Sequence, residues 1–219
     1  MAANINMVLH VACLMDFLTL IKSRRSSKSL GVGEVPFEVV LKALEAGVWA
    51  ANAHNAQPWR FVVVSDPDVK RRLIEEMGRE WLSDLLADGV DEAKARQIVE
   101  SSNGRSMRAS YIIVACLCMS DMDVYWDSKR RRCEYVMGVQ SVAAAVQNIL
   151  LAVHALGYGA CWRCSPLFAP EAVKHVLGLP SDFEPMAFVE IGLRGGETMG
   201  RRKPLSDVAS LNRWGEPIC

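Results

Sequence analysis

The segment 50–61 joins two stretches that have the patterns of core elements, although the segment itself is polar. Apolar residues recur at helical spacing over 37–48 before it, and the β-branched run 61–64 follows it. Four of its side chains both donate and accept hydrogen bonds: Asn52, His54, Asn55 and Gln57. A helix, a polar turn and a strand in immediate succession predict mixed α and β structure, with a polar site at the junction.

Periodicity and turn residues place the other elements. Helices are expected at about 16–23, 36–50, 67–79, 135–156 and 170–177, with two short helices between 80 and 102 separated at Gly89. Strands are expected at 61–64, 111–119 and 186–191, and loops at 31–35, 120–134 and 158–164. Because no repeat or linker divides the chain, we predict a single α+β domain over 15–219. Residues 1–14 form an optional extension, since Met15 is an alternative start.

Composition excludes several classes of partner. Lys plus Arg and Asp plus Glu both total 25, so the net charge gives no drive toward nucleic acid or anionic membrane. The apolar run 5–21 is interrupted by His10 and Asp16, and it is too short between them to span a bilayer. The 7 cysteines are odd in number, and a chain of 219 residues needs no disulfide framework. We therefore expect reduced thiols in a cytoplasmic protein that lies outside the membrane.

A basic cluster, Arg24-Arg25-Ser26-Ser27-Lys28, follows the first predicted helix. Its guanidinium groups, hydroxyls and ammonium suit a phosphate monoester, which needs several charge-assisted donors at once. A second basic group, Arg201-Arg202-Lys203, could converge on the same anion. The alternative is a solvated basic loop, and the same alternative applies to the basic run 129–132.

Two further motifs are better explained without a metal or catalytic role. Cys161-Trp162-Arg163-Cys164 has the spacing of a redox pair or of half a zinc site, but Pro166 follows closely and glycines precede it. We expect these cysteines to be small core residues. His54 is accompanied by no nucleophile signature and by no second histidine at metal-ligand spacing. The sequence therefore predicts neither a metal site nor a catalytic side chain.

Three motifs in order resemble those of the FMN-dependent nitroreductase-like family. The cluster 24–28 resembles the family motif R-R-S-x-R/K, and Ala51 to Trp59 resembles P-S-x-x-N-x-Q-P-W. Gln147-Asn148 with the segment 157–162 resembles Q-N-L-L-L-A-A-x-x-L-G-L-G-x-x-W. Residues 79–192 are most similar to the flavin-binding C-terminal domain of the bifunctional deazaflavin-coenzyme γ-glutamyl ligase.

The resemblance implies a fold and a cofactor site. The fold would be a central, mostly antiparallel sheet flanked by helices, in an intertwined homodimer with FMN at the interface. By carry-over, phosphate and ribityl would be held by Arg24, Arg25, Ser26, Lys28 and Arg202. Asn52 and Asn55 would meet the flavin ring, and backbone around Cys161, Trp162 and Arg163 would lie near its N5. The candidate cofactor-binding set also includes Ala53, Gln57 and Arg201.

The implied activity belongs to the flavin. A nicotinamide donor, NADH or NADPH, would reduce FMN, and an electrophilic small molecule such as a nitro compound, quinone or enone would then take the hydride by a ping-pong mechanism. The acceptor pocket is expected from segments near 79–104 and 120–134. One alternative is a flavin- or deazaflavin-binding accessory protein with little turnover. A thiol-disulfide enzyme using Cys161 and Cys164 is the other.

Overall fold

The computed structural model describes residues 16–196 and 200–218, so the predicted extension 1–14 lies outside the described residues. The helices are α1 (Phe17–Ser23), α2 (Phe37–Val48), α3 (Pro67–Ala87), α4 (Glu92–Met107), α5 (Ser128–Ala155) and α6 (Pro170–Leu177). The strands are β1 (Ser29–Gly31), β2 (Trp59–Val64), β3 (Tyr111–Cys118), β4 (Gly159–Arg163) and β5 (Phe183–Gly196). Short 3₁₀ turns are η1 (Ala53–Asn55), η2 (Met119–Asp121), η3 (Ser165–Phe168) and η4 (Leu205–Asp207).

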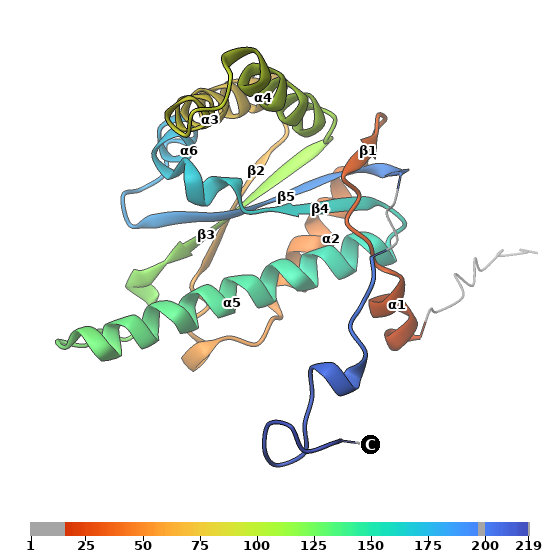
Figure 1. The fold of residues 1–219 in the computed structure, drawn as a ribbon, viewed down its shortest axis with the longest axis vertical. Helices are drawn as coiled ribbons and strands as arrows, with labels where there is room; N and C mark the ends of the chain where they lie inside the picture. The colour runs from red at the N-terminus through yellow and green to blue at the C-terminus, as the bar shows by residue number, and fades with distance from the viewer. Residues whose placement is uncertain (1–15, 197–199, 219) are drawn as a thin grey trace, which may run out of the picture.

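The long strand β5 organises the sheet. It pairs with β3 over its first half and with β1 near its end, and β4 pairs with it as a branch. The strand β2 completes the order β1-β5-β3-β2. All four pairings are antiparallel, and helices cover both faces of the sheet (Figure 1). The expected architecture, an antiparallel sheet flanked by helices, is confirmed.

Alternation along β3 divides the interior into two layers. Ile113, Ala115 and Leu117 face the layer that contains α2 and α5. Ile112, Val114 and Cys116 face the layer that contains α3 and α6. Successive strand residues point to opposite faces, so a strand covered on both sides has to be apolar at every position. This requirement explains why 111–119 is an unbroken apolar run in the sequence.

The helix α5 is the longest element and packs against α2. Gly47 of α2 permits this close approach, because a Cβ there would lie 2.8 Å from a side-chain atom of Ile149. The mean hydropathy of one window in α5 reaches 1.7, which would suit a membrane span by length and composition. Val142, Val146 and Val153 of this helix instead lie buried in the core between α2 and the sheet. Its apolar character is therefore explained by the core.

The start of α5 differs from the prediction. The segment 120–134 was expected to be a polar connection, but α5 begins at Ser128 and contains the basic run 129–132 in its first turns. Asp127 caps the helix, because its carboxylate accepts the backbone N–H of Arg130 at 2.9 Å. Its second oxygen accepts from Arg130 Nε at 2.5 Å. Basic side chains are unfavourable at a helix N-terminus, and this carboxylate compensates them.

Three other boundaries also differ. The helix α3 continues to Ala87, so it replaces both the helix expected at 67–79 and the short helix expected before Gly89. The break near Gly89 is confirmed, because α4 begins at Glu92. The segment 158–164 was expected to be a loop, but residues 159–163 form β4. The short strand β1 was not predicted, and it ends at Gly31, where the glycine loop had been expected to begin. Both strands are held by pairing with β5, which is a tertiary contact that local sequence does not encode.

The packing of α5 gives a test of the fold. Ile149 is fully buried between α2 and the sheet, so Ile149→Ala should lower the free energy of unfolding by about 2–5 kcal/mol. Leu86→Ala is the control, because this α3 side chain is 41% exposed and should change the free energy by less than about 1 kcal/mol. Urea unfolding followed by circular dichroism measures both. Equal losses in the two variants would contradict the assignment of α5 to the core.

Candidate functional site

The basic cluster 24–28 forms the connection between α1 and β1. The helix α1 begins at Asp16, whose carboxylate accepts the backbone N–H groups of Leu18 and Thr19. It is held at its end by a 2.9 Å hydrogen bond between Ser23 Oγ and His154 Nε2. The backbone N–H of Ser27 then donates to the carbonyl of Ala160 on β4 at 2.9 Å. The cluster is therefore fixed between the C-terminal end of α5 and the strand β4.

The cations of this cluster are close to one another and to the C-terminal tail. The pKa of Arg24 is lowered first by burial, and then by the positive charges of Arg202 and Arg25. The Arg25 Nη1 group donates to the carbonyls of Lys22 and Arg24 at 2.5 and 2.9 Å. Within the part of the chain described, no hydrogen bond or ion pair engages the Arg24 guanidinium. Arg24 is thus a half-buried cation that is repelled by the positive charges of Arg25 and Arg202. An anion bound there would reduce this repulsion.

The remaining members of the two basic groups lie at the surface. The carbonyl of Ser26 accepts the backbone N–H of Lys28 at 3.1 Å, and both residues are exposed. Arg201 is also exposed, and its carbonyl accepts from Arg202 Nη1 at 3.1 Å. The structure therefore brings the charge of Arg202 near Arg24. The side chain of Arg201 forms no hydrogen bond or ion pair within the described residues.

The strand β4 lies at the centre of these charges. Burial raises the pKa of the Cys161 thiol, Glu190 raises it further, and the charges of Arg163, Lys28 and Arg105 lower it. Cations from three separate segments therefore act on one atom of β4. Arg163 Nε donates to Glu190 Oε2 at 2.7 Å, and this carboxylate is 2% exposed. The ion pair orients the guanidinium of Arg163 on one face of the strand.

Ser27 Oγ and Trp162 Nε1 are buried donor atoms beside β4 that lack partners among the described residues, and the acceptor Glu190 Oε1 also lacks one. Gly159 is required for the position of Ser27, because a Cβ at Gly159 would lie 2.9 Å from that hydroxyl oxygen. Buried donors without partners cost about 1–3 kcal/mol each. They therefore offer hydrogen bonds to a ligand placed beside β4.

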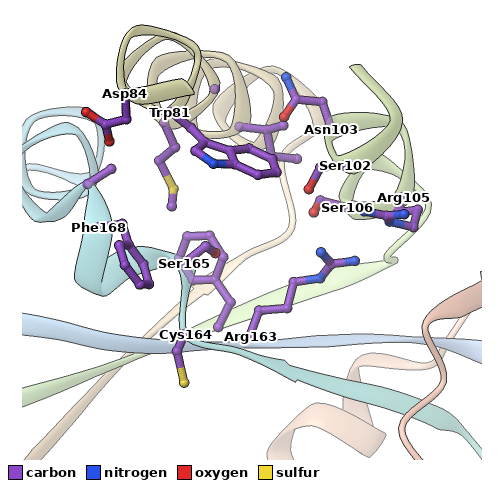
Figure 2. Close-up of a pocket in the computed structure, with 15 residues that line it drawn as sticks. Trp81, Asp84, Ser102, Asn103, Arg105, Ser106, Arg163, Cys164, Ser165 and Phe168 are labelled. Carbon is purple, nitrogen blue, oxygen red and sulfur yellow. The ribbon is translucent and has the colours of Figure 1, made fainter. Parts of the chain in front are cut away.

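A cavity of about 460 Å³ opens between the sheet and the helices α3 and α4 (Figure 2). Its apolar wall includes Ile74, Met77, Trp81, Phe168 and Phe188. Its polar wall includes Ser102, Asn103, Arg105, Ser106 and Arg163. Figure 2 shows Arg163 extending from β4 toward Ser106 and Arg105, whereas the thiol of Cys164 points away. An apolar cavity with cations on one wall suits a flat ligand that carries a polar or anionic edge.

The turn η1 has an unusual backbone. His54, Asn55 and Gln57 have φ values of 55°, 55° and 51°, in the left-handed region that non-glycine residues seldom occupy. Asn52 stabilises the turn, because its Oδ1 accepts the backbone N–H of Gln57 at 2.9 Å and its Nδ2 donates to the carbonyl of Ala50 at 3.2 Å. Both groups of the Asn52 amide are thus used within the turn. The side chains of Asn55 and Gln57 remain exposed.

The turn η1 lies far from the basic cluster within one chain. The backbone N–H of Ala53 donates to Ser141 Oγ on α5 at 3.1 Å. Ser23, which precedes the basic cluster, bonds instead to His154 of α5. At about 1.5 Å per residue, Ser141 and His154 are separated by about 20 Å along the helix. The structure therefore brings Arg24, Lys28, Arg202 and Arg163 together around β4, and places Asn52, Ala53, Asn55 and Gln57 elsewhere.

Several residues around the cavity were not identified from the sequence. Arg105, Ser102 and Ser106 lie in a polar helix with no recognisable motif, and only tertiary structure places them opposite β4. The segment 79–104, from which the pocket was expected, contains Trp81, Ser102 and Asn103, whereas Arg105 and Ser106 lie just beyond it. Ser102 and Ser106 are four positions apart, so one turn of helix puts both on the same face. That spacing was the signal available in the sequence.

Comparisons with known proteins identify the family of the chain. Residues 21–193 match the model of the nitroreductase family. A protein of Archaeoglobus fulgidus named "Putative NADH dehydrogenase/NAD(P)H nitroreductase" is 28% identical over 181 residues, covering 81% of this chain and 84% of that protein. The iodotyrosine deiodinase of Haliscomenobacter hydrossis is 27% identical over 190 residues, covering 81% and 78%.

A solved structure gives the same result for the fold. The crystal structure of "a putative nitroreductase in complex with FMN" from Desulfovibrio desulfuricans superimposes with a TM-score of 0.67 at 26% identity. The match covers 90% of this chain and 96% of that one. The fold and the family model together define a nitroreductase-like protein. The chain belongs to the nitroreductase family.

Cysteine labelling tests the environment of β4. Burial raises the pKa of Cys161 and raises that of Cys116 to about 12, so both thiols hold little thiolate at pH 8. Cys164 and Cys133 are exposed. Iodoacetamide at pH 8, followed by peptide mass spectrometry, should modify Cys164 and Cys133 at least about tenfold faster than Cys161. Faster reaction at Cys161 would instead support a redox role for the pair Cys161 and Cys164.

Proposed function

We propose that the protein is an FMN-dependent oxidoreductase that uses NADH or NADPH and reduces an electrophilic small molecule. The observation that carries the proposal is the convergence of cations around β4, beside a largely apolar cavity. A phosphorylated cofactor with a flat ring has both properties that this arrangement requires. The relative with FMN and the nitroreductase names among the family members support the same cofactor.

The residues present fit FMN. Its phosphate and ribityl would be held by the basic groups, with Arg24, Arg25, Ser26, Lys28, Arg201 and Arg202 as the contributing residues. The unpartnered atoms Ser27 Oγ and Trp162 Nε1 would supply further hydrogen bonds. The backbone of Cys161, Trp162 and Arg163 would contact the ring, and the adjoining cavity would receive the ring edge or the acceptor.

A second copy of the chain would complete the site. The exposed turn η1 lies about 20 Å along α5 from the basic cluster, so Asn52, Ala53, Asn55 and Gln57 would reach the flavin held by the partner. Asn52 would act there through the turn that it holds in shape. The strain in the turn also suggests a functional conformation, since left-handed non-glycine residues cost about 1–3 kcal/mol each.

The surface supports such a homodimer. The outward face of α2 exposes Phe37, Leu41 and Val48, and Trp49 beside it is 82% exposed. The C-terminal tail runs away from the body of the chain and exposes Leu205, Val208, Leu211 and Trp214 (Figure 1). Large exposed apolar surfaces of this kind mark protein interfaces. The apolar residues of α1 would add to the same surface.

In the proposed mechanism the side chains bind and orient the cofactor and the acceptor. When bound, FMN supplies two-electron transfer between a nicotinamide donor and the acceptor. Arg105 places positive charge at the cavity wall, where it would stabilise negative charge on the ring edge or on the acceptor. The charge of Arg163 is balanced by Glu190, so Arg163 would act there as a hydrogen-bond donor. Glu190 fixes the direction of Arg163. No side-chain nucleophile is required, which agrees with the expectation from the sequence.

The acceptor would be an electrophilic small molecule such as a nitro compound, quinone or enone. The family resemblance and the deiodinase among the relatives suggest that an aryl halide belongs to the same set. The cavity at about 460 Å³ is of a size that suits such molecules. We place the protein in the cytoplasm, as its free thiols and neutral charge suggest.

Removal of one cation tests the phosphate assignment. Arg24→Ala should weaken FMN binding by at least about tenfold, since a charge-assisted hydrogen bond contributes about 1.5–3 kcal/mol. Arg130→Ala is the matched control, because Arg130 is paired with Asp127 on the first turn of α5. Fluorescence titration of the apoprotein with FMN gives both dissociation constants. Equal constants for the two variants would overturn the assignment, and a wild-type protein that binds no FMN would overturn the cofactor.

A flavin- or deazaflavin-binding accessory protein is the second candidate, favoured by the similarity of 79–192 to the ligase domain. Stopped-flow mixing with NADH and with NADPH separates the two functions. In an oxidoreductase, reduction of the bound flavin should remove about the full amplitude of the absorbance near 450 nm within about a second, at typical turnover rates. Air should restore it. An absorbance that stays unchanged with both donors would favour the accessory role.

A further inference from the structure

Three ligand-type side chains from separate segments meet beside η1. His54 belongs to η1, Asp123 follows η2, and Glu134 lies in the second turn of α5. One nitrogen or oxygen atom of each lies within 4.8 Å of the others. His54 Nε2 and Glu134 Oε1 are 3.5 Å apart. These residues have no metal-ligand spacing along the chain, because they meet only through tertiary structure.

Glu134 is the unusual member of this group. The residue is 3% exposed, and its Oε2 atom finds no hydrogen-bond partner in residues 16–196 and 200–218. A buried carboxylate is costly unless both its charge and its lone pairs are satisfied. His54 approaches only Oε1, so the second oxygen is left without a partner. Within the described residues, His54 is therefore the one ion-pair partner of this buried carboxylate, whose hydrogen-bonding capacity is only half used.

Two neighbouring acidic side chains already form ion pairs with arginines. Asp121 pairs with Arg60 at 2.7 Å, and Asp127 pairs with Arg130. Asp123 is exposed and makes no ion pair within the described chain. It is thus the carboxylate of this connection that remains available to a cation.

We propose that His54, Asp123 and Glu134 bind one divalent transition-metal ion of the zinc class. An imidazole nitrogen with two carboxylates suits Zn²⁺ and its neighbours, whereas Mg²⁺ and Ca²⁺ prefer oxygen ligands alone. Metal–ligand bonds of about 2.1 Å place adjacent ligand atoms about 3–3.5 Å apart. The His54–Glu134 separation of 3.5 Å already meets this requirement. A rotation of the exposed Asp123 side chain would bring in the third ligand.

The ion would have a positioning role. It would tie η1 to α5 and to the connection that precedes α5, across a backbone in which His54 has a φ of 55°. It would also satisfy the second oxygen of Glu134. The turn so held carries Asn55 and Gln57 on its exposed side. Three protein ligands leave a coordination position for water.

The test measures metal binding directly and is independent of flavin. The full-length protein is stripped with EDTA, dialysed and titrated with Co²⁺, with the visible d–d bands as the readout, and Zn²⁺ content is measured after gel filtration. We expect one ion per chain. His54→Asn and Asp123→Asn should each weaken Co²⁺ binding by at least about tenfold, since even outer-shell changes cost 10–100-fold. Glu134→Gln should abolish the bands.

Controls separate metal ligation from a simple ion pair. His175→Asn removes an exposed histidine on α6 and should bind Co²⁺ as the wild type does. The Glu134→Gln variant could fail to fold, because Glu134 is buried. The variants at His54 and Asp123 change exposed residues and should fold, so they decide the test. The proposal is overturned if the wild type binds no ion, or if the His54 and Asp123 variants bind as tightly as His175→Asn. Flavin binding that persists in either case leaves the proposed activity intact.

Discussion

The antiparallel pairing of β3 with β5 is the constraint on which the rest of the structure depends. It runs from Tyr111 opposite Ile191 to Cys118 opposite Phe183, and it presents an apolar face to each helical layer. A shift of one residue would turn each face toward the wrong layer. The same strand β5 then pairs with β4 and β1. The basic cluster and the cavity are therefore both positioned by β5.

Sequence patterns predicted the elements whose burial is complete. The strand 111–119 was recognised because every position of a strand covered on both faces has to be apolar. The apolar half of α5 was recognised because every third to fourth residue has to be apolar there. The first turns of α5 were missed, since their cap at Asp127 precedes basic residues and no apolar stripe marks them. The strand β4 was missed because its five residues are stabilised by pairing with β5, which lies far away in the sequence.

The site was predictable only in part, for a physical reason. Motif resemblance identified the basic cluster and the polar turn, but not the left-handed backbone at His54, Asn55 and Gln57. Asn and His occupy that region more often than other non-glycine residues, but local propensity does not predict three such residues in one short turn. Arg105 is a similar case, because nothing in a polar helix indicates which of its side chains faces a distant strand. Proximity of this kind is a property of the tertiary structure.

The balance of charge around β4 links fold and site most directly. Glu190 lies opposite Cys161 in the pairing of β4 with β5, and its buried carboxylate is matched by Arg163 at 2.7 Å. Without that partner the carboxylate would be an uncompensated buried charge, which costs several kcal/mol. With it, the pair is neutral, and the charges of Arg24, Lys28 and Arg105 beside it remain uncompensated by any ion pair within the described chain. The surroundings of β4 are therefore net positive, and an anionic group on a bound ligand would compensate this charge.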